Sequence, residues 1–270
     1  MRLEITSAIV PIPFLEILRQ NVGVLNDIVA EFQTDPNVVA VVLVGSAARD
    51  EMDAFSDLDV HVVVLEQRPP DRSSYQNDRL VNINFVDVNN RKEMLTNPWR
   101  ALWNVLPAMQ AKILFDPNGW YSSLQDKARV FSWAQVQEAA NLEVSKLLAG
   151  NAEEANKILS GLQNQNLEKA LYATLGMTMG MANVSALARG ALMTTENRFW
   201  STICDAEPDS RWQELLWAAL GMNTETVVAR ATAALGLYVR SVELHGACLT
   251  LQDAAIATRV VQLIERQKNQ

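Results

Sequence analysis

Several features are scarce in this sequence, and each scarcity narrows the class of protein. Only two cysteines occur, Cys204 and Cys248, with no CxxC spacing and no cluster of histidines and cysteines around them. This pattern excludes a disulfide framework and a cysteine-based zinc site, and lone cysteines in an apolar chain are usually buried thiols. No low-complexity tract or internal repeat is present. Because the cysteines form no disulfide pattern, a reducing cytoplasm is the expected compartment.

Positive charge and long apolar runs are also scarce. The 23 Lys and Arg residues are outnumbered by 31 Asp and Glu, which gives a net charge of −8. Such a chain has no net attraction for the phosphates of nucleic acid or of an anionic membrane. No stretch reaches the roughly 18 apolar residues of a membrane-spanning helix, and the N-terminal apolar run is shorter than that of a signal peptide. We expect a small-molecule substrate and neither a nucleic-acid nor a membrane partner.

What is present is enough hydrophobic content, 49% of 270 residues, for one large core or two moderate ones. The first part of the chain begins with a helical pattern at residues 13–32. Four strand-like runs follow, at residues 38–44, 57–65, 79–88 and 111–115. The polar stretch 66–78 contains tandem prolines and is expected to be a loop.

From Trp120 onward, every long segment has helical spacing. We therefore predict an α+β chain of two domains, residues 1–125 and 126–270. The first is a mixed sheet flanked by helices, and the second is an all-α helical bundle. The apolar stripes of the last helices, residues 224–264, would serve the bundle core or a homodimer.

The densest set of chemically informative residues lies within residues 38–65. An apolar strand is followed by Gly45 and Ser46, a sharp turn into a short helical segment. A second apolar strand begins with Asp57 and Asp59. Because strand side chains alternate between faces, the two carboxylates point the same way. Two like charges on one face of a buried strand are costly without a cation, so the pattern indicates a divalent-metal site.

The string GSAARDEMDAFSDLD, residues 45–59, closely resembles the signature of the DNA polymerase beta-like nucleotidyltransferase superfamily. In that signature Gly-Ser is followed, after a short loop, by Ser-Asp-x-Asp, and every element is present as Gly45, Ser46, Ser56, Asp57 and Asp59. The mixed first half and helical second half further resemble the layout of lincosamide and aminoglycoside nucleotidyltransferases. The resemblance implies a nucleotidyltransferase fold followed by a helical domain.

The resemblance also implies roles for these residues. Asp57 and Asp59 would be catalytic and would bind one or two Mg²⁺, which neutralise charge as an NMP group moves from an NTP to an acceptor and pyrophosphate leaves. Gly45 would let the backbone approach the nucleotide phosphates, and Ser46 would donate its hydroxyl and N–H to them. Arg49, about one helical turn beyond, would reach the same phosphates.

The superfamily usually carries a third catalytic carboxylate on the strand that corresponds to residues 79–88. Alignment by strand pattern places Asn82 at that position, and an amide cannot act as a base. Asp87 is the only acid on this strand and is the predicted third catalytic acid, although strand alternation places it on the opposite face from Asn82. Glu66 and Asp53 are the alternatives.

Three functional classes follow from these expectations. The first is an enzyme that transfers an NMP group from an NTP, with ATP the first candidate, to a hydroxyl of a small molecule. An aminoglycoside or a lincosamide antibiotic is the type of acceptor implied by the resemblance. The second is a nucleotide-binding protein of weakened activity, favoured by Asn82. The third is a nucleotidyltransferase that modifies protein.

Overall fold

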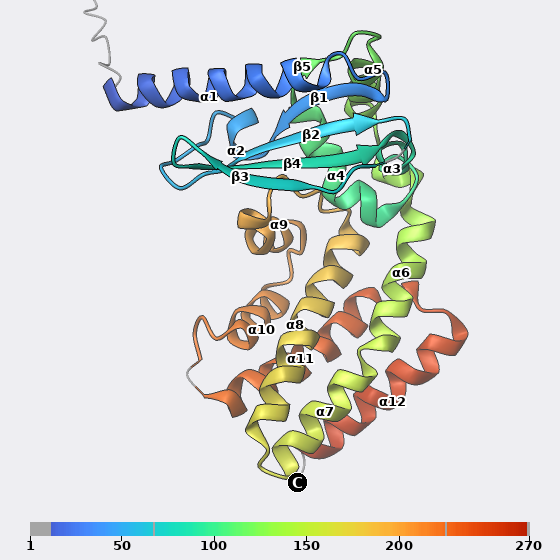
Figure 1. Cartoon of the computed structure of the whole chain (residues 1–270). Helices are drawn as coiled ribbons and strands as arrows, with labels where there is room; N and C mark the ends of the chain where they lie inside the picture. Colours follow the sequence, from blue (N-terminus) through green and yellow to red (C-terminus); the bar gives the residue numbers. More distant parts are fainter. Residues whose placement is uncertain (1–11, 67, 225, 269–270) are drawn as a thin grey trace, which may run out of the picture. The chain divides into compact units, whose positions relative to one another are not determined.

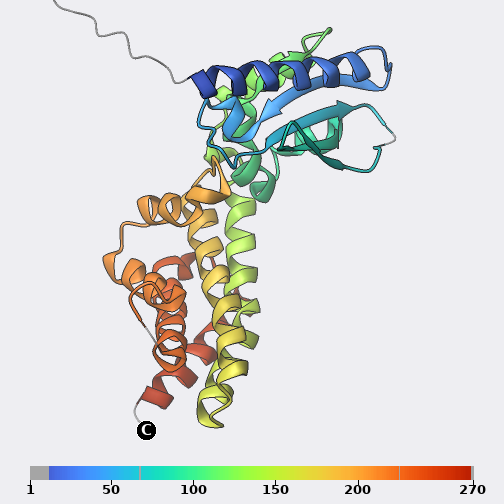
Figure 2. The ribbon, with the colours of Figure 1, turned by 60° about the vertical axis from the view of Figure 1, so that its left-hand side comes forward.

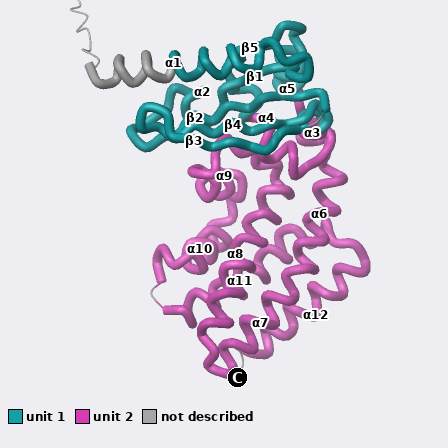
Figure 3. Tube along the Cα trace, in the orientation of Figure 1, with its two compact units in different colours: residues 1–92, 107–129 teal, residues 93–106, 130–270 magenta. Residues whose placement is uncertain are grey.

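We describe a computed structural model of the chain over residues 12–66, 68–224 and 226–268. The described part divides into two compact units (Figure 3). The first comprises residues up to 92 and 107–129, and the second comprises 93–106 and residues from 130 onward. The N-terminal residues 1–11, on which part of the signal-peptide argument rests, lie outside the described residues.

The first unit is built on a five-stranded sheet with the strand order β3-β4-β2-β1-β5. Its central pair, β2 and β4, is parallel, and every other neighbouring pair is antiparallel. The sheet is therefore mixed, as predicted. Its elements are α1 (Ile12–Phe32), β1 (Val38–Val44), α2 (Gly45–Ala48), β2 (Leu58–Val64), β3 (Arg72–Gln76), β4 (Arg79–Asp87), α3 (Val88–Glu93), β5 (Lys112–Phe115) and α5 (Trp120–Arg129).

Helix α1 lies along one face of this sheet (Figures 1 and 2). Its buried residues Val24, Ile28 and Phe32 pack on the apolar faces of β1, β2 and β4, and the ring of Phe32 meets that of Phe85 edge to face. All seven residues of β1 are buried. The strand is therefore buried on both faces, and it ends at the turn that opens the candidate site.

The second unit is all-helical and is organised around α8 (Leu167–Arg189), which is flanked by α6, α7, α10 and α11 (Figure 1). Its core is one large apolar cluster that includes the buried Trp212 and Tyr238. The remaining helices are α6 (Gln137–Gly150), α7 (Ala152–Gln163), α9 (Phe199–Ala206), α10 (Ser210–Leu220), α11 (Val227–His245) and α12 (Leu251–Lys268), with short 3-10 turns at Trp133–Gln135, Glu196–Arg198 and Gly246–Cys248.

Helix α4 (Pro98–Gln110) is shared, because residues up to 106 group with the second unit and residues from 107 with the first. The first unit ends at Arg129, and the segment 93–106, which the sequence assigned to the first domain, groups with the helices. No helix among the described residues is long and apolar enough to span a membrane.

The predicted fold class is confirmed, and so are the four predicted strands. One prediction is wrong: the stretch 66–78 is not all loop, because residues 72–76 form the edge strand β3, paired with β4. The turn between them is Asn77-Asp78, both with positive φ. Two successive left-handed residues match the twist of a tight hairpin, and Asn and Asp tolerate that conformation.

Candidate active site

The site begins where β1 ends. Gly45 has φ +72°, a left-handed conformation that favours glycine, and opens the four-residue helix α2. Ala47 and Ala48 bury their methyl groups in the apolar core of the first unit, which anchors the turn. Strand β2 brings Asp59 alongside, since Val44 and Asp59 pair in the antiparallel ladder. A Cβ on Gly45 would lie only 2.8 Å from Asp59 Oδ2.

Asp57 and Asp59 are joined by the amide of Asn82. The register of the parallel strands places Asn82 directly beside Asp59. Its Nδ2 donates hydrogen bonds to Asp57 Oδ2 at 2.9 Å and to Asp59 Oδ1 at 3.1 Å. The two carboxylates therefore converge on one point, as the alternation of strand side chains predicts.

Burial raises the pKa of the Asp59 carboxyl, and the neighbouring Asp57 adds to the rise, while the hydrogen bond from Asn82 opposes it. The environment thus disfavours the charged form of Asp59 in the absence of a further positive group. A cation beside the pair would reverse this balance, because an opposite charge stabilises a carboxylate.

The loop before Asp57 is closed by Asp53 and Ser56. The Asp53 N–H donates to Ser56 Oγ, and Ser56 Oγ donates to Asp53 Oδ1, each at 2.9 Å. The hydrogen bond from Ser56 is the main cause that lowers the pKa of the Asp53 carboxyl. Arg79, at the start of β4, donates to the carbonyl of Ser56. Ser56 therefore fixes the backbone that delivers Asp57 to the site.

The two predicted phosphate-binding side chains lie on and just after α2. The Ser46 carbonyl accepts from the N–H groups of Arg49 at 3.2 Å and Glu51 at 3.0 Å, which closes the turn. The Arg49 side chain is mostly buried, with 13% exposed, and its Nε donates to Glu51 Oε2 at 2.8 Å. The structure thus holds Arg49 against the same loop as Ser46.

Asp87 is not brought to this site. It pairs with Val64 at the opposite end of β2 from Asp59, five residues beyond Asn82, a span of roughly 16 Å along a strand. Its Oδ1 accepts from the N–H groups of Asn89 at 3.0 Å and Asn90 at 2.9 Å at the start of α3. The bond from Asn90 is the main cause that lowers the pKa of the Asp87 carboxyl. The geometry is that of a helix cap.

The other two candidates for the third acid occupy different places. Glu66 lies just beyond the Val64 end of β2, where its N–H donates to Asn37 Oδ1. Asp53 is engaged by Ser56 and by the N–H of Phe55 in the loop described above. The Asn82 amide instead meets Asp57, Asp59 and Ser73.

His61 lies one step further along the same face of β2. Its Nδ1 hydrogen-bonds with the guanidinium of the buried Arg91. Burial, helped by Arg91, lowers the pKa of His61 to about 3, so the imidazole is neutral at pH 7. A neutral ring with so low a pKa is a poor proton acceptor.

The donor set suits a hard divalent cation. Mg²⁺ is usually bound by one or two carboxylates together with water and substrate phosphates. The oxygens of Asp57 and Asp59 that converge on the Asn82 amide fit that pattern. Within the described part of the chain, no group of three or more His, Cys, Asp or Glu side chains gathers as potential metal ligands.

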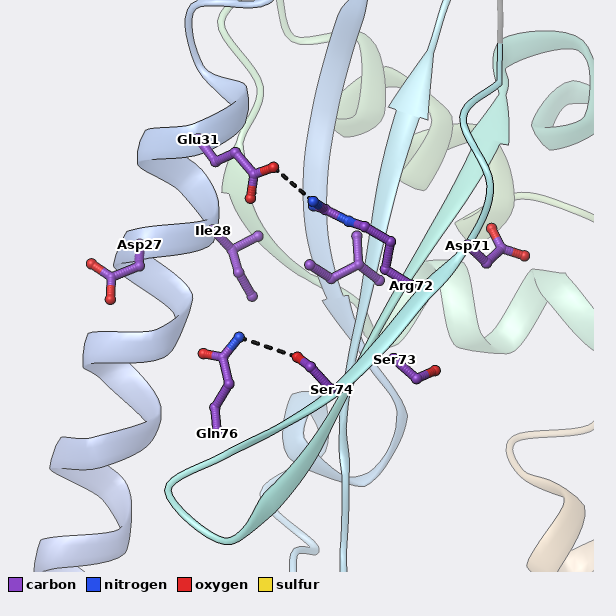
Figure 4. Close-up of a pocket in the computed structure, with 9 residues that line it drawn as sticks. Asp27, Ile28, Glu31, Asp71, Arg72, Ser73, Ser74 and Gln76 are labelled. Carbon is purple, nitrogen blue, oxygen red and sulfur yellow. Dashed lines mark hydrogen bonds and ion pairs between the residues drawn. The ribbon is translucent and has the colours of Figure 1, made fainter.

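A pocket of about 600 Å³ lies between α1 and β3 (Figure 4). Arg72 crosses it, paired with Glu31 at 2.9 Å, and its guanidinium lies over the ring of Phe32 at 5.3 Å. No pattern in the sequence predicts this pocket, and Asp57 and Asp59 do not line it. Its lining consists of Asp27, Ile28, Glu31, Asp71, Arg72, Ser73, Ser74, Gln76 and Ile83.

Fold and site together define a nucleotidyltransferase fold followed by a helical domain. Residues 25–97 match the family model of the nucleotidyltransferase domain. The match spans most of the sheet and both candidate carboxylates, and it supports nucleotidyl transfer as the general class of reaction.

Among solved structures, the chain is similar to a nucleotidyltransferase-like protein from Exiguobacterium sibiricum 255-15. The TM-score is 0.53 at 16% identity, and the similarity covers 91% of this chain and 79% of that one. At this identity the likeness shows the fold. A search of curated proteins finds no match.

Sequence reasoning missed one member of the site, Ser73. Its Oγ donates to Asn82 Oδ1 at 2.8 Å, and it pairs with Asn82 across β3 and β4. The signal that could have found it is the Asn77-Asp78 turn, which predicts a hairpin and so a strand over the preceding residues.

Proposed function

We propose that the chain transfers an NMP group from an NTP to an acceptor hydroxyl, with a divalent cation held by Asp57 and Asp59. The observation that carries the proposal is the convergence of these two carboxylates beside the Gly45 turn. The family match over residues 25–97 supports the same reaction class. Mg²⁺ is the cation that this oxygen donor set favours.

When bound, the cation supplies charge neutralisation for the transferred phosphoryl group and the leaving pyrophosphate. The residues of the chain would do the rest. Asp57 and Asp59 orient the cation. Gly45, which has no side chain, leaves the carboxylate of Asp59 accessible, and the Ser46 hydroxyl and N–H donate to phosphate oxygens. Arg49 lies at the same turn, where it is paired with Glu51, and its guanidinium would reach the same phosphates.

The acceptor is proposed to be a small molecule, because the charge of −8 disfavours a polyanionic partner. A cationic aminoglycoside would suit this charge. A lincosamide would instead need a more apolar lining. We propose ATP as the first nucleotide to test.

The proposal is tested by pyrophosphate release from each of the four NTPs with Mg²⁺, against a panel of aminoglycosides and lincosamides. Release that depends on one acceptor, and that Asp57→Asn/Asp59→Asn abolishes, would support it. The matched control is Asp126→Asn, a 74% exposed carboxylate in the same unit that pairs with nearby Arg129. Equal release by the Asp57→Asn/Asp59→Asn variant would overturn the proposal.

A second candidate function rests on Asn82, which occupies the strand position beside Asp59 without offering a base. In this alternative the chain binds NTP and metal but turns over slowly. General-base assistance is worth about 10²–10⁴-fold, so its absence would leave a slow enzyme. Metal-dependent NTP binding without pyrophosphate release for any small acceptor would favour this candidate, and label transfer to a polypeptide would favour a protein acceptor.

A further inference from the structure

The amide of Asn82 engages both its nitrogen and its oxygen. Its two N–H groups point at the two carboxylates, to Asp57 and Asp59, and its oxygen accepts from Ser73 Oγ. An amide nitrogen thus lies between one oxygen of each carboxylate, Asp57 Oδ2 and Asp59 Oδ1. A cation bound between those same two oxygens would meet two N–H donors, which it repels, so the amide in this orientation opposes a cation at that point.

The partner of the amide oxygen permits a change. A hydroxyl can donate or accept, whereas the amide has a donating and an accepting side. A half-turn of the Asn82 amide would present its oxygen to the carboxylate side and its nitrogen to Ser73. Ser73 Oγ would then accept instead of donate, and the amide nitrogen would keep a partner.

We propose that Asn82 is a third, neutral oxygen ligand of the cation, reached when its amide turns over and Ser73 changes from hydrogen-bond donor to acceptor. The inference rests on the proposed function only in that Asp57 and Asp59 bind a cation. Because Asn82 is uncharged, the three proposed ligand side chains carry two negative charges in total, those of Asp57 and Asp59. One divalent cation balances these two charges. Ser73 is a positioning residue, because it acts through Asn82.

The competing possibility makes the opposite prediction. If the amide keeps its nitrogen toward the carboxylates, Asn82 acts as a substitute for the cation and opposes metal binding. Replacing Asn82 by an apolar side chain of similar size would then tighten metal binding. If Asn82 is a ligand, the same replacement weakens it. The sign of the effect decides between the two.

The experiment is a titration of the full chain with Mn²⁺ alone, followed by the electron paramagnetic resonance signal of free Mn²⁺. For Asn82→Leu, which has no side-chain oxygen, we expect the affinity for Mn²⁺ to fall about tenfold or more. For Asn82→Asp, which keeps an oxygen at this position, we expect an affinity for Mn²⁺ at least equal to that of the wild type. Ser73→Ala should weaken binding by a smaller factor. The matched control is Ser74→Ala, the next residue of the same exposed strand, whose Oγ contacts Gln76.

Tighter Mn²⁺ binding by Asn82→Leu, or no difference between Ser73→Ala and Ser74→Ala, would overturn the inference. Circular dichroism and thermal unfolding check that each variant is folded. Because Ser73 is exposed, its replacement by alanine leaves the apolar core of the first unit unchanged and so tests the inference apart from any loss of stability. Loss of Mn²⁺ binding in Asp57→Asn/Asp59→Asn, together with tighter binding in Asn82→Leu, would contradict this inference alone. Unchanged binding in Asp57→Asn/Asp59→Asn would contradict the proposed function as well.

Discussion

Gly45 and Asp59 approach so closely that a Cβ on Gly45 would lie 2.8 Å from Asp59 Oδ2. The contact joins the end of β1 to the start of β2, and it couples the turn to the carboxylate that is proposed to hold the cation. Any side chain at position 45 would have to displace that carboxylate.

The first prediction concerns Gly45→Ala. The left-handed conformation alone costs an alanine about 1–2 kcal/mol. In addition, the new Cβ would push the Asp59 carboxylate out of its position. We expect the affinity for Mg²⁺–NTP, measured by calorimetry, to fall about tenfold or more. Gly119→Ala is the control, because Gly119 has φ +67° and no described atom lies within 4 Å of the position that a Cβ would take there. Equal loss of binding in both variants would mean that backbone strain, and not the carboxylate, is responsible.

The second prediction concerns the stability of the carboxylate pair. Two like charges share one site, so we expect Asp57→Asn/Asp59→Asn to unfold at the same temperature as the wild type or higher in the presence of EDTA. A ligand that binds only the folded state raises the unfolding temperature. Mn²⁺ should therefore stabilise the wild type and leave the Asp57→Asn/Asp59→Asn variant unchanged. An equal Mn²⁺ shift in both proteins would place the cation elsewhere.

The third prediction concerns Asp87, which caps α3 at the other end of the strands. Asn is also a good cap, so Asp87→Asn should keep both turnover and stability. Asp87→Ala should lower the free energy of unfolding by about 1 kcal/mol without a specific loss of turnover. Urea unfolding and pyrophosphate release measure the two effects. A loss of turnover of about 100-fold in Asp87→Asn would instead restore Asp87 as the third acid.

The fourth prediction concerns a buried ionic cluster in the helical unit. The side chain of Glu207 is fully buried, and its carboxylate accepts from Arg189 Nη2 at 2.9 Å and lies 3.0 Å from His245 Nε2. Burial by itself would raise the pKa of Glu207, but His245 and Arg189 outweigh it and lower the pKa to about 2. Because the folded pKa is depressed, this stabilisation is present above the ordinary value of 4.5 and is lost as the pH falls toward 2.

Glu207→Gln should therefore lower the free energy of unfolding at pH 7 by on the order of 3 kcal/mol, and the difference should shrink below about pH 4.5. Urea unfolding across pH measures it. Glu214→Gln is the control on α10, since Glu214 is 64% exposed and pairs with exposed Arg211. A Glu207→Gln difference that stayed constant from pH 7 to pH 3 would contradict the assigned linkage.

The extent to which sequence predicted the molecule follows from how local each signal is. The Gly45 turn and the Asp57/Asp59 pair are local, because strand alternation alone puts both carboxylates on one face. Alternation likewise places Asn82 and Asp87 on opposite faces of their strand. The capping role of Asp87 depends on where α3 starts, and no local pattern marked that start.

The edge strand β3 shows why the rest could not be predicted. Apart from Tyr75 its five residues are polar, and most are exposed, so they carry no apolar alternation. The tandem prolines nearby favour a loop. The strand forms because β4 offers it a partner and Asn77-Asp78 make the turn. Ser73, and with it the orientation of the Asn82 amide, depends on that tertiary pairing.

The central claim is that Asp57 and Asp59 hold a cation on which NTP binding depends. The most direct measurement is calorimetry of each of the four NTPs with wild type, Asp57→Asn/Asp59→Asn and Asp126→Asn, in Mg²⁺ and in EDTA. We predict binding of at least one NTP in Mg²⁺ by the wild type and Asp126→Asn, and loss of that binding in EDTA and in Asp57→Asn/Asp59→Asn. Binding of equal strength under all of these conditions would contradict the claim.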